Sequence, residues 1–279
     1  MTRRGFLLGG LGAGLAATHG CAAPRSNASG NQTVRAQVPD SLSQPPAPTE
    51  AITTEMVTSS ARNTNVRLIT IRPAGVGGRL PVCLALHGRG SNATMFLDLG
   101  IPEFLNRAVA AGVKPFGVVS VDGGDTYWVS KKPEDDPQKM LRDDVPTWLA
   151  NRGFGEPFAT MGISMGGYGA LNYARTPGLN AVAAISAAMF SSWADAKIRN
   201  AFADEQAWRA TEPLRNVDKL NDIQVGVWCG TSDPFVGQAR QLIDKAHPKI
   251  AAIGPGDHTE TYWKRIFPDV MRFLGDSVP

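Results

Sequence analysis

The sequence predicts an α/β protein with a mostly parallel central sheet and helices on both of its faces. Short, almost purely apolar runs recur along the 279 residues and alternate with stretches of helical spacing. Strands that are buried on both faces of a parallel sheet have this continuous apolar character. Most of the runs end in glycine or a small polar residue, and no internal repeat is present. Such alternation is typical of a single α/β domain.

The first 23 residues predict an export signal. Arg3 and Arg4 precede an apolar stretch from Phe6 to Ala17, which is followed by small residues. A charged start, an apolar middle and a small-residue end are the parts of a secretory signal, and paired arginines are typical of the twin-arginine type. We therefore expect an exported protein, found in the cell envelope or secreted. A short buried helix is the alternative, which the four glycines of this stretch disfavour.

Cys21 raises the question of lipid attachment. Many bacterial lipoproteins are cleaved directly before a cysteine that then carries lipid, but Thr18, His19 and Gly20 depart from the usual residues at such a site. Cleavage after Ala23 by an ordinary signal peptidase is the other route. The sequence is compatible with a membrane-anchored lipoprotein and with a protein that carries no lipid.

Residues 24–50 predict a disordered tether. The stretch is rich in Ser, Pro, Asn, Gln and Thr and holds almost no large apolar side chain. Such a segment cannot bury enough surface to offset the chain entropy that folding would remove. Residues 51–279 are then expected to form the α/β domain.

Seven apolar runs in this domain are the predicted strands. The first, Val66 to Ile71, alternates with a period of two and is expected to be partly exposed. The other six are compact and are expected to be buried on both faces of the sheet. These six are 81–88, 116–124, 158–164, 181–187, 225–233 and 249–254.

Three stretches between the strands have helical spacing and end near Gly or Pro: 93–112, 140–153 and 168–178. A longer segment, at about 189–222, interrupts the alternation of predicted strands and helices. It holds four large aromatic side chains, which are Phe190, Trp193, Phe202 and Trp208. An insertion at the carboxyl edge of the sheet can cover a pocket like a lid. An ordinary helical excursion on the surface is the alternative.

The charge balance excludes a nucleic-acid footprint. The net charge is +3, and removal of the leader with Arg3 and Arg4 leaves it at about +1. Lys and Arg are scattered and form no basic run. No cluster of His, Cys and carboxylates has metal-ligand spacing, so neither a metal nor a cofactor is predicted. Cys83 and Cys229 lie in apolar runs and are expected to be buried free thiols.

A G-x-S-x-G motif spans Gly162 to Gly166 and contains Ser164. The motif alone arises easily by chance, but here a predicted strand precedes it and a helix opening follows it. A strand–serine–helix turn is the arrangement of a nucleophile elbow, which lifts the hydroxyl above the sheet at the positive end of a helix. Its glycines let neighbouring segments pass close to the strained serine. Ser164 is therefore the candidate nucleophile.

A serine hydroxyl needs a base, usually a histidine, which follows the serine along the chain in folds of this type. His247 and His258 are late enough. His258 is favoured because it follows a predicted strand and a glycine-rich loop, where catalytic loops gather. The acid that orients the imidazole is expected to be Asp233, which comes directly off a buried strand. Asp257 is the rival, but as the direct neighbour of His258 it is poorly placed to hold the ring.

An acyl-transfer site also needs donors for the developing oxyanion. The backbone N–H of Met165, directly after the serine, is expected to be one. The other is expected from the loop after the 81–88 strand, at the N–H of Arg89, with His87 and Gly88 shaping that loop. A simple strand-exit turn is the alternative reading of the loop.

Five motifs together resemble the esterase family of α/β-hydrolases, which includes S-formylglutathione hydrolases of the esterase D type and the secreted mycolyltransferases. They are LALHGRGSN, VDGGDTYW, GISMGGYGAL, CGTSDPF and HTETYWKRIFPDVMRFL. The resemblance implies an α/β-hydrolase fold with Ser164 as nucleophile, Asp233 as acid and His258 as base. It also implies that the N–H groups of Arg89 and Met165 form the oxyanion hole.

The resemblance extends from about Val66 to Leu274. VDGGDTYW is similar to a family loop that borders the pocket, so Tyr127 and Trp128, together with His87, are expected at the substrate pocket. Relatives often have a tryptophan soon after the histidine, whereas this sequence continues with two polar residues. The pocket is therefore expected to be more polar here.

The residues and the resemblance predict an exported serine esterase that hydrolyses carboxylic esters through an acyl-enzyme. Its expected substrates are acylated envelope glycans or glycolipids. An acyltransferase that uses a sugar hydroxyl in place of water would need the same residues, so both reactions stay open at this point. An inactive binding protein on the same scaffold is a third reading, which the intact Ser164, Asp233 and His258 disfavour. Acyl length and oligomeric state are not predicted.

Overall fold

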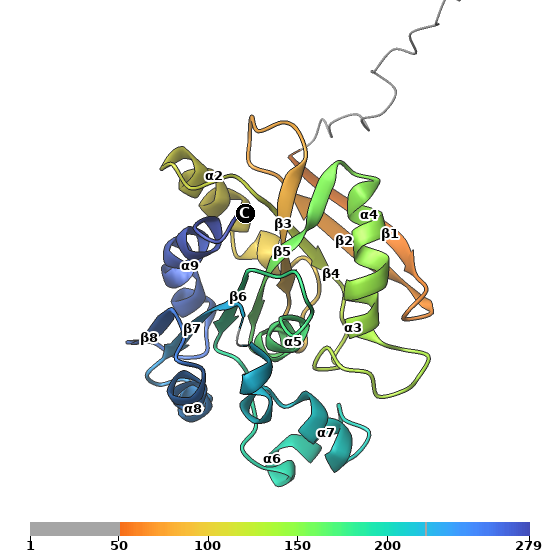
Figure 1. Ribbon diagram of the computed structural model, residues 1–279, viewed down its shortest axis with the longest axis vertical. Coiled ribbons are helices and arrows are strands. Elements are labelled where there is room, and N and C mark those ends of the chain that lie inside the picture. The colour runs from red at the N-terminus through yellow and green to blue at the C-terminus, as the bar shows by residue number, and fades with distance from the viewer. Residues whose placement is uncertain (1–50, 221) are drawn as a thin grey trace, which may run out of the picture. The chain divides into compact units, whose positions relative to one another are not determined.

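A central sheet of eight strands organises the domain in the computed structural model, which describes residues 51–220 and 222–279 (Figure 1). The strands are β1 (Ile52–Ser59), β2 (Thr64–Ile71), β3 (Leu80–Leu86), β4 (Gly117–Val121), β5 (Phe154–Ile163), β6 (Ala181–Ile185), β7 (Gln224–Gly230) and β8 (Ile250–Gly254). Their spatial order is β1-β2-β4-β3-β5-β6-β7-β8. The predicted leader, Cys21 and the predicted tether lie outside the described residues.

The sheet is mostly parallel, as predicted. From β4 to β8 every neighbouring pair is parallel, whereas β1 pairs antiparallel with β2 and β2 pairs antiparallel with β4. The β1 strand was not predicted, because its side chains are largely exposed and form no apolar run. It pairs with β2 along its whole length, from Ile52 opposite Ile71 to Ser59 opposite Thr64.

The expected exposure of two strands was wrong. The stretch of β2 from Leu68 to Ile71 is buried, because β1 and β4 flank it and its side chains enter apolar layers on both faces of the sheet. The β8 strand was expected to be buried, but its residues are exposed or half-buried. It lies at the edge of the sheet, where β7 is its one neighbouring strand among the described residues. Position within the sheet, rather than apolar content, decided both cases.

Helices cover both faces of the sheet. The principal ones are α1 (Met95–Asp98), α2 (Ile101–Ala110), α3 (Pro137–Lys139), α4 (Val145–Ala150), α5 (Met165–Tyr173), α8 (Val236–Ala246) and α9 (Glu260–Gly275). Helices α2 and α9 pack together against one face, and α4, α5 and α8 pack against the other (Figure 1). The predicted helix 93–112 is divided into α1 and α2 at Gly100, whose φ of 81° interrupts helical geometry.

Helix α5 is buried along its whole length. Its small residues allow this, because larger side chains would collide with the segments that cross the helix. A Cβ atom at Gly169 would overlap the ring of Trp128, and one at Gly167 would press on Ala187. The helix therefore packs tightly behind β5, and the residue before it, Ser164, stands at the carboxyl edge of the sheet.

The predicted insertion at about 189–222 is helical. It contains α6 (Trp193–Lys197), α7 (Glu205–Thr211), η3 (Pro213–Arg215) and η4 (Val217–Leu220), and α6 and α7 lie at the bottom of Figure 1. One buried carboxylate links two parts of this segment. Glu212 accepts hydrogen bonds from Trp208 Nε1 at 2.9 Å and from the Phe190 N–H at 3.2 Å. The start of the insertion is thus tied from inside to the end of α7.

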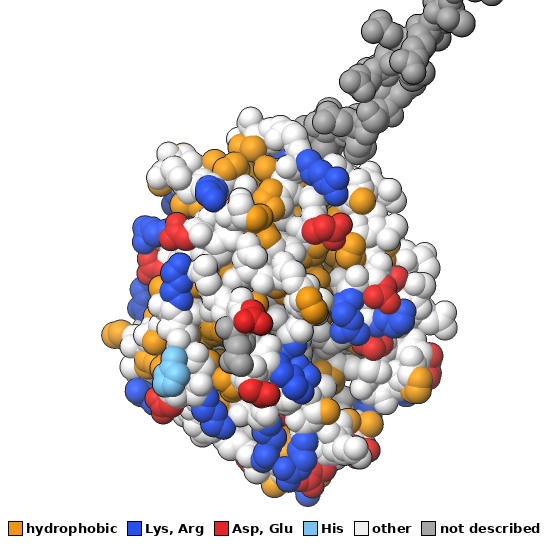
Figure 2. All heavy atoms as spheres, in the orientation of Figure 1, with side chains coloured by type: hydrophobic (Ala, Val, Ile, Leu, Met, Phe, Trp, Pro, Cys, Tyr) orange, Lys and Arg blue, Asp and Glu red, His pale blue; other side chains and the backbone are white. Residues whose placement is uncertain are grey.

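The distribution of charge on one face and the state of two thiols can be compared with the sequence. Lys and Arg side chains lie in several separate places on the face that Figure 2 shows, with Asp and Glu between them. Cys83 and Cys229 are buried free thiols. In the part of the chain that the structure describes, no helix combines the length and the apolar character needed to cross a bilayer.

Candidate active site

Ser164 occupies a sharp turn between β5 and α5. Its backbone has φ 57° and ψ −118°, a conformation that is rare for a residue with a side chain. Three backbone hydrogen bonds hold it there. The Ser164 N–H donates to the Ile185 oxygen at 3.0 Å, and the Ser164 oxygen accepts from Tyr168 at 3.2 Å and from Ala188 at 3.0 Å. The turn is therefore held by α5 and by the end of β6 with the residues that follow it.

The two glycines of the motif are required by close backbone contacts. A Cβ atom at Gly162 would overlap the oxygen of Gly166, and a Cβ atom at Gly166 would overlap the oxygen of Leu86. The strand β3 and the turn at Ser164 thus pass each other with no room for a side chain. This close approach brings the loop after β3 alongside the serine.

A chain of hydrogen bonds joins three side chains that are far apart in the sequence. His258 Nε2 lies 2.9 Å from Ser164 Oγ, and His258 Nδ1 lies 2.9 Å from Asp233 Oδ2. Because a carboxylate only accepts, Nδ1 carries the proton and Nε2 is free to accept from the serine hydroxyl. Asp233 follows β7, His258 follows β8, and Ser164 follows β5, so all three meet at the carboxyl edge of the sheet.

The alternative acid and the alternative base considered from the sequence, Asp257 and His247, do not contact Ser164. Asp257 is exposed and its carboxylate accepts from the Thr259 hydroxyl at 2.6 Å. His247 ends helix α8 in a left-handed conformation, with φ 45°. The structure therefore brings His258 and Asp233 to Ser164 and leaves His247 and Asp257 away from it.

The Asp233 carboxylate is buried and well supplied with donors. Burial would raise its pKa, but hydrogen bonds from His258, from the Phe235 N–H at 2.8 Å and from the Ser186 hydroxyl outweigh it, and the pKa lies below its ordinary value. The group is therefore ionised at neutral pH and can stabilise a positive charge on the imidazole.

Ser186 and Trp263 form a second layer that the sequence analysis missed. Ser186 is fully buried after β6, with φ 48°, and its Oγ accepts from Trp263 Nε1 at 3.1 Å. The ring of Trp263 also packs edge-on against His258, with ring centroids 5.3 Å apart. No short sequence motif identifies this pair, because Ser186 follows β6 and Trp263 lies in α9, and the two meet only in the folded chain.

The loop after β3 holds the second predicted oxyanion donor. Arg89 lines the cavity in front of Ser164, and a Cβ atom added at Gly88 would lie 3.6 Å from Ser164 Cβ. Met165, the first predicted donor, opens α5, where a helix has no partner of its own for the N–H. Both backbone groups thus belong to segments that border the serine.

His87 does not reach the cavity, contrary to the expectation. It is fully buried, its Nδ1 donates to the Gly88 oxygen at 2.9 Å, and its Nε2 accepts from the Gly123 N–H at 2.8 Å. Burial lowers the pKa of His87, so the ring is neutral and in one tautomer. It therefore braces the loop after β3 against the loop after β4.

The predicted pocket pair Tyr127 and Trp128 is divided between two environments. Tyr127 lines the cavity, but Trp128 lies beneath it with no exposed surface. The Trp128 ring fills the space over Gly123 and Gly169, and its Nε1 donates to the His87 oxygen at 3.2 Å. Trp128 thus supports the loop rather than bordering the pocket. Both residues have positive φ values, 55° and 58°.

An open cavity of about 500 Å³ adjoins Ser164 and His258. Arg89 and Tyr127 were expected there. Eight further residues line it: Met189, Phe190, Asp195, Ile198, Arg199, Pro234, Phe235 and Gln238. The first five belong to the insertion, so this segment does border the site. The sequence showed an aromatic insertion but not which side chains face the serine.

No group of three or more His, Cys, Asp or Glu side chains could hold a metal ion among residues 51–220 and 222–279. The polar groups at the site are those of a serine, a histidine and an aspartate, with backbone N–H groups beside them. This set suits acyl transfer through a nucleophilic hydroxyl.

Known proteins match the fold and the family. The family model described as "Putative esterase" matches residues 59–274. A ferulic acid esterase structure is similar with a TM-score of 0.69 at 19% identity, covering 82% of this chain and 98% of that one. For the fluorophosphonate-binding serine hydrolase F of Staphylococcus aureus the TM-score is 0.66 at 17% identity, covering 81% and 98%.

An S-formylglutathione hydrolase from Agrobacterium tumefaciens is similar with a TM-score of 0.67 at 14% identity, covering 82% of this chain and 95% of that one. No curated protein matches the sequence. These structures share the α/β-hydrolase fold with this chain, and the family match spans most of the domain. The chain therefore belongs to the esterase family, and it is a carboxylic ester hydrolase.

Proposed function

We propose that this protein hydrolyses carboxylic esters with Ser164 as nucleophile, His258 as general base and Asp233 as the acid that orients the imidazole. The observation that carries the proposal is the pair of 2.9 Å contacts that link the three side chains at the mouth of a cavity. Such a series of hydrogen bonds activates a serine hydroxyl, which is otherwise a weak nucleophile at neutral pH.

The proposed reaction has two halves. Ser164 Oγ attacks the ester carbonyl carbon while His258 Nε2 takes the hydroxyl proton. The N–H groups of Met165 and Arg89 stabilise the oxyanion, and Asp233 stabilises the imidazolium. The C–O bond to the alcohol then breaks, and His258 returns the proton to the leaving alcohol. A water molecule attacks the acyl-enzyme in the same way and releases the acid.

The cavity supports an ester with an apolar acyl part and a polar alcohol part. Tyr127, Phe190 and Ile198 give it an apolar side, and Arg89 and Arg199 give it cationic donors. A volume of about 500 Å³ suits a ligand of moderate size. With the export signal that the leader predicts, we propose acylated glycans or glycolipids of the cell envelope as substrates.

The cellular location is a separate part of the proposal. We propose export by the twin-arginine route, with attachment to the membrane if Cys21 carries lipid. Mass spectrometry of the mature protein from cells identifies its first residue and any lipid on it. A mature chain that begins at Cys21 with a diacylglycerol mass supports the anchor. A chain that begins at Pro24 contradicts lipid attachment, and an uncleaved leader contradicts this account of export.

A fluorophosphonate probe tests the catalytic proposal. The wild type is expected to be labelled, Ser164→Ala to lose both labelling and hydrolysis of p-nitrophenyl acetate, and the exposed neighbour Ser191→Ala to keep both. Circular dichroism checks that Ser164→Ala is folded. Labelling that persists in folded Ser164→Ala, or no labelling of the wild type, would overturn the role of Ser164.

Hydrolysis is favoured over acyl transfer because the site is accessible to water. The His258 side chain is 24% exposed, and the cavity opens to the surface. A product assay with a p-nitrophenyl ester and a trehalose-like sugar acceptor compares the two reactions. The free acid is expected as the main product. Acylated sugar as the main product at millimolar acceptor would replace the esterase by an acyltransferase.

A further inference from the structure

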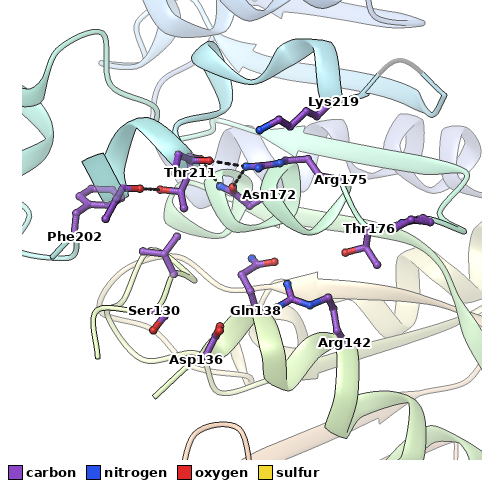
Figure 3. A pocket seen from close by; sticks show the side chains of 14 residues that line it. Ser130, Asp136, Gln138, Arg142, Asn172, Arg175, Thr176, Phe202, Thr211 and Lys219 are labelled. Atoms are coloured by element: carbon purple, nitrogen blue, oxygen red, sulfur yellow. Dashed lines mark hydrogen bonds between the residues drawn. The ribbon is translucent and has the colours of Figure 1, made fainter. Parts of the chain in front are cut away.

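We propose that the protein has a second, non-catalytic site that binds a small acidic sugar, carrying a phosphate or a carboxylate, in a cavity of about 700 Å³ beside helix α5. This cavity contains none of the residues Ser164, Asp233 and His258. The proposal therefore does not depend on the reaction proposed above. The cavity lies between α5, the α3–η2 segment and the insertion helices α7 and η4, where η2 is Met140–Asp144 (Figure 3).

Three cations converge on this cavity, against one carboxylate. Arg142 comes from η2, Arg175 follows α5, and Lys219 comes from η4. None of the three lies within 4.0 Å of an acidic oxygen among the residues that the structure describes. The carboxylate, Asp136, is engaged as the cap of α3, where it accepts from the Lys139 N–H at 2.9 Å. The lining therefore carries more cations than carboxylates, and Asp218, outside the lining, also acts on the charge of Arg175.

Arg175 is the most firmly held of the three. Its Nη1 donates to Asn172 Oδ1 at 2.9 Å and to the Ala210 oxygen at 3.0 Å, and both acceptors are neutral. Burial lowers the pKa of Arg175, which reports partial loss of water around its charge. Its other two nitrogens make no hydrogen bond to the described residues. A fixed guanidinium with open donors suits a phosphate or carboxylate oxygen.

The cations approach from different sides of the cavity. In Figure 3, Arg142 and Gln138 lie on one side, and Lys219 and Arg175 lie across from them. Lys219 is steadied by Asn216 Oδ1 at 2.8 Å, and Gln138 donates to the Gly169 oxygen at 3.1 Å. Charges from three separate elements can surround one anionic group, which a single exposed lysine cannot do.

The remaining lining suits the ring and hydroxyls of a sugar. Thr176 brings a hydroxyl, and Val129 and the ring of Phe202 form apolar surface. The hydroxyls of Ser130 and Thr211 also line the cavity, but they donate to the oxygens of Lys132 and Ala207 and are left to act as acceptors. The volume of about 700 Å³ lies in the range of sites for small organic ligands. A bare inorganic anion would leave most of this space unused, so the site favours an anion attached to a polar ring.

The second cavity shares an aromatic wall with the active-site cavity. Phe202 lines the second cavity, and Tyr127 lines the cavity at Ser164. The centroids of these two rings are 5.8 Å apart. Phe190 also lines the active-site cavity, and its ring centroid lies 6.3 Å from that of Phe202. The two sites are therefore neighbours that are separated by packed rings, and each can be occupied without the other.

Calorimetric titration of full-length Ser164→Ala at low salt tests the proposal, because this variant cannot turn over an ester. The probes are glucose 1-phosphate, methyl glucuronide, methyl glucoside and inorganic phosphate. At least one of the two acidic sugars is expected to bind. If both bind, the one with the lower Kd shows whether phosphate or carboxylate is the preferred anion. Methyl glucoside and inorganic phosphate are expected to bind at least about tenfold more weakly, because each lacks half of the contacts.

Variants of the three cations locate the site. In the same background, the double variant Arg142→Gln/Lys219→Gln is expected to weaken binding at least about tenfold, and Arg175→Lys to weaken it severalfold. The control Lys264→Gln/Arg272→Gln removes the same charge from α9 and is expected to bind normally. No binding of either acid, equal binding of methyl glucoside or of phosphate, or equal loss in the control would overturn the proposal.

Discussion

The indole N–H of Trp263 donates a hydrogen bond to Ser186 Oγ over 3.1 Å, and the Ser186 hydroxyl is one of the donors that lower the pKa of Asp233. The same indole packs against the imidazole of His258, with ring centroids 5.3 Å apart. One side chain of α9 thus supports both partners of Ser164. We infer that Trp263 and Ser186 are positioning residues, which act through Asp233 and His258.

Trp263→Phe tests this role, because it keeps an aromatic ring and removes the N–H. We expect kcat for p-nitrophenyl acetate to fall about tenfold with little change in KM, since one buried hydrogen bond that orients the acid is lost. The acid limb of the kcat–pH profile is expected to shift as well. Trp148→Phe, on α4, is the matched control and should keep the wild-type profile. An unchanged kcat and profile in Trp263→Phe would contradict the positioning role.

Asp233→Asn is expected to lower kcat by about 10⁴-fold while the fold is retained. An amide can donate to Nδ1 and so favours the tautomer in which Nε2 carries the proton, which cannot accept from Ser164. Steady-state kinetics of Asp233→Asn and of Asp257→Asn compare the two acids directly. Asp257→Asn should remain close to wild type, because among the described residues the Asp257 carboxylate bonds the exposed Thr259 hydroxyl alone. Comparable losses in both variants would be inconsistent with the proposed triad.

Gly166→Ala is expected to destabilise the protein by several kcal/mol or to prevent folding, because the added methyl would overlap the Leu86 oxygen of the neighbouring strand. Gly237→Ala in α8 meets no atom within 4 Å and should stabilise the protein by up to about 1 kcal/mol. Urea unfolding followed by circular dichroism measures both. A Gly166→Ala variant as stable as wild type would mean that the turn at Ser164 is looser than described.

Glu212 makes stability depend on pH. Burial raises its pKa to about 7 in spite of the donors Trp208, Leu214 and Phe190, whereas the group ionises near 4.5 in the unfolded chain. The folded protein therefore holds an extra proton between these values, and this group's contribution to the free energy of unfolding falls as pH rises through that window. The loss is expected to reach about 3 kcal/mol by pH 8.

Glu212→Gln removes this titration. Urea unfolding at pH 5 and pH 8 should show the wild type losing stability relative to Glu212→Gln as pH rises. Glu205→Gln, an exposed change on α7, is the control and should follow the wild type at both values. Parallel pH dependence of wild type and Glu212→Gln would show that the buried carboxyl does not titrate in this window.

Ile198 is a 71% exposed apolar side chain at the active-site cavity. We expect Ile198→Ser to lower kcat/KM for p-nitrophenyl hexanoate about fivefold and to leave the acetate unchanged, since only a longer acyl chain reaches this contact. Met56→Ser on β1 removes a comparably exposed apolar group and should alter neither substrate. An equal effect on both esters would place Ile198 away from the acyl group.

Local sequence was sufficient for the strand core and for the serine turn. A continuous apolar run indicates a strand that is buried on two faces, and G-x-S-x-G between a strand and a helix indicates a tight turn. Both features can be predicted because they depend on residues that are neighbours in the chain. The β1 strand was missed, since an exposed edge strand has no apolar run. The exposures of β2 and β8 were misjudged, because burial depends on which strands lie beside them.

The tertiary structure decided which side chains face Ser164. The sequence placed Tyr127, Trp128 and His87 together, but the packing of Trp128 over Gly169 and the two hydrogen bonds of His87 direct those two rings inward. Likewise, Trp263 and Ser186 meet behind Asp233 only because β6 and α9 are brought together by the sheet. Short-range patterns specify backbone and burial, whereas the direction of each side chain is set by neighbours distant in the chain.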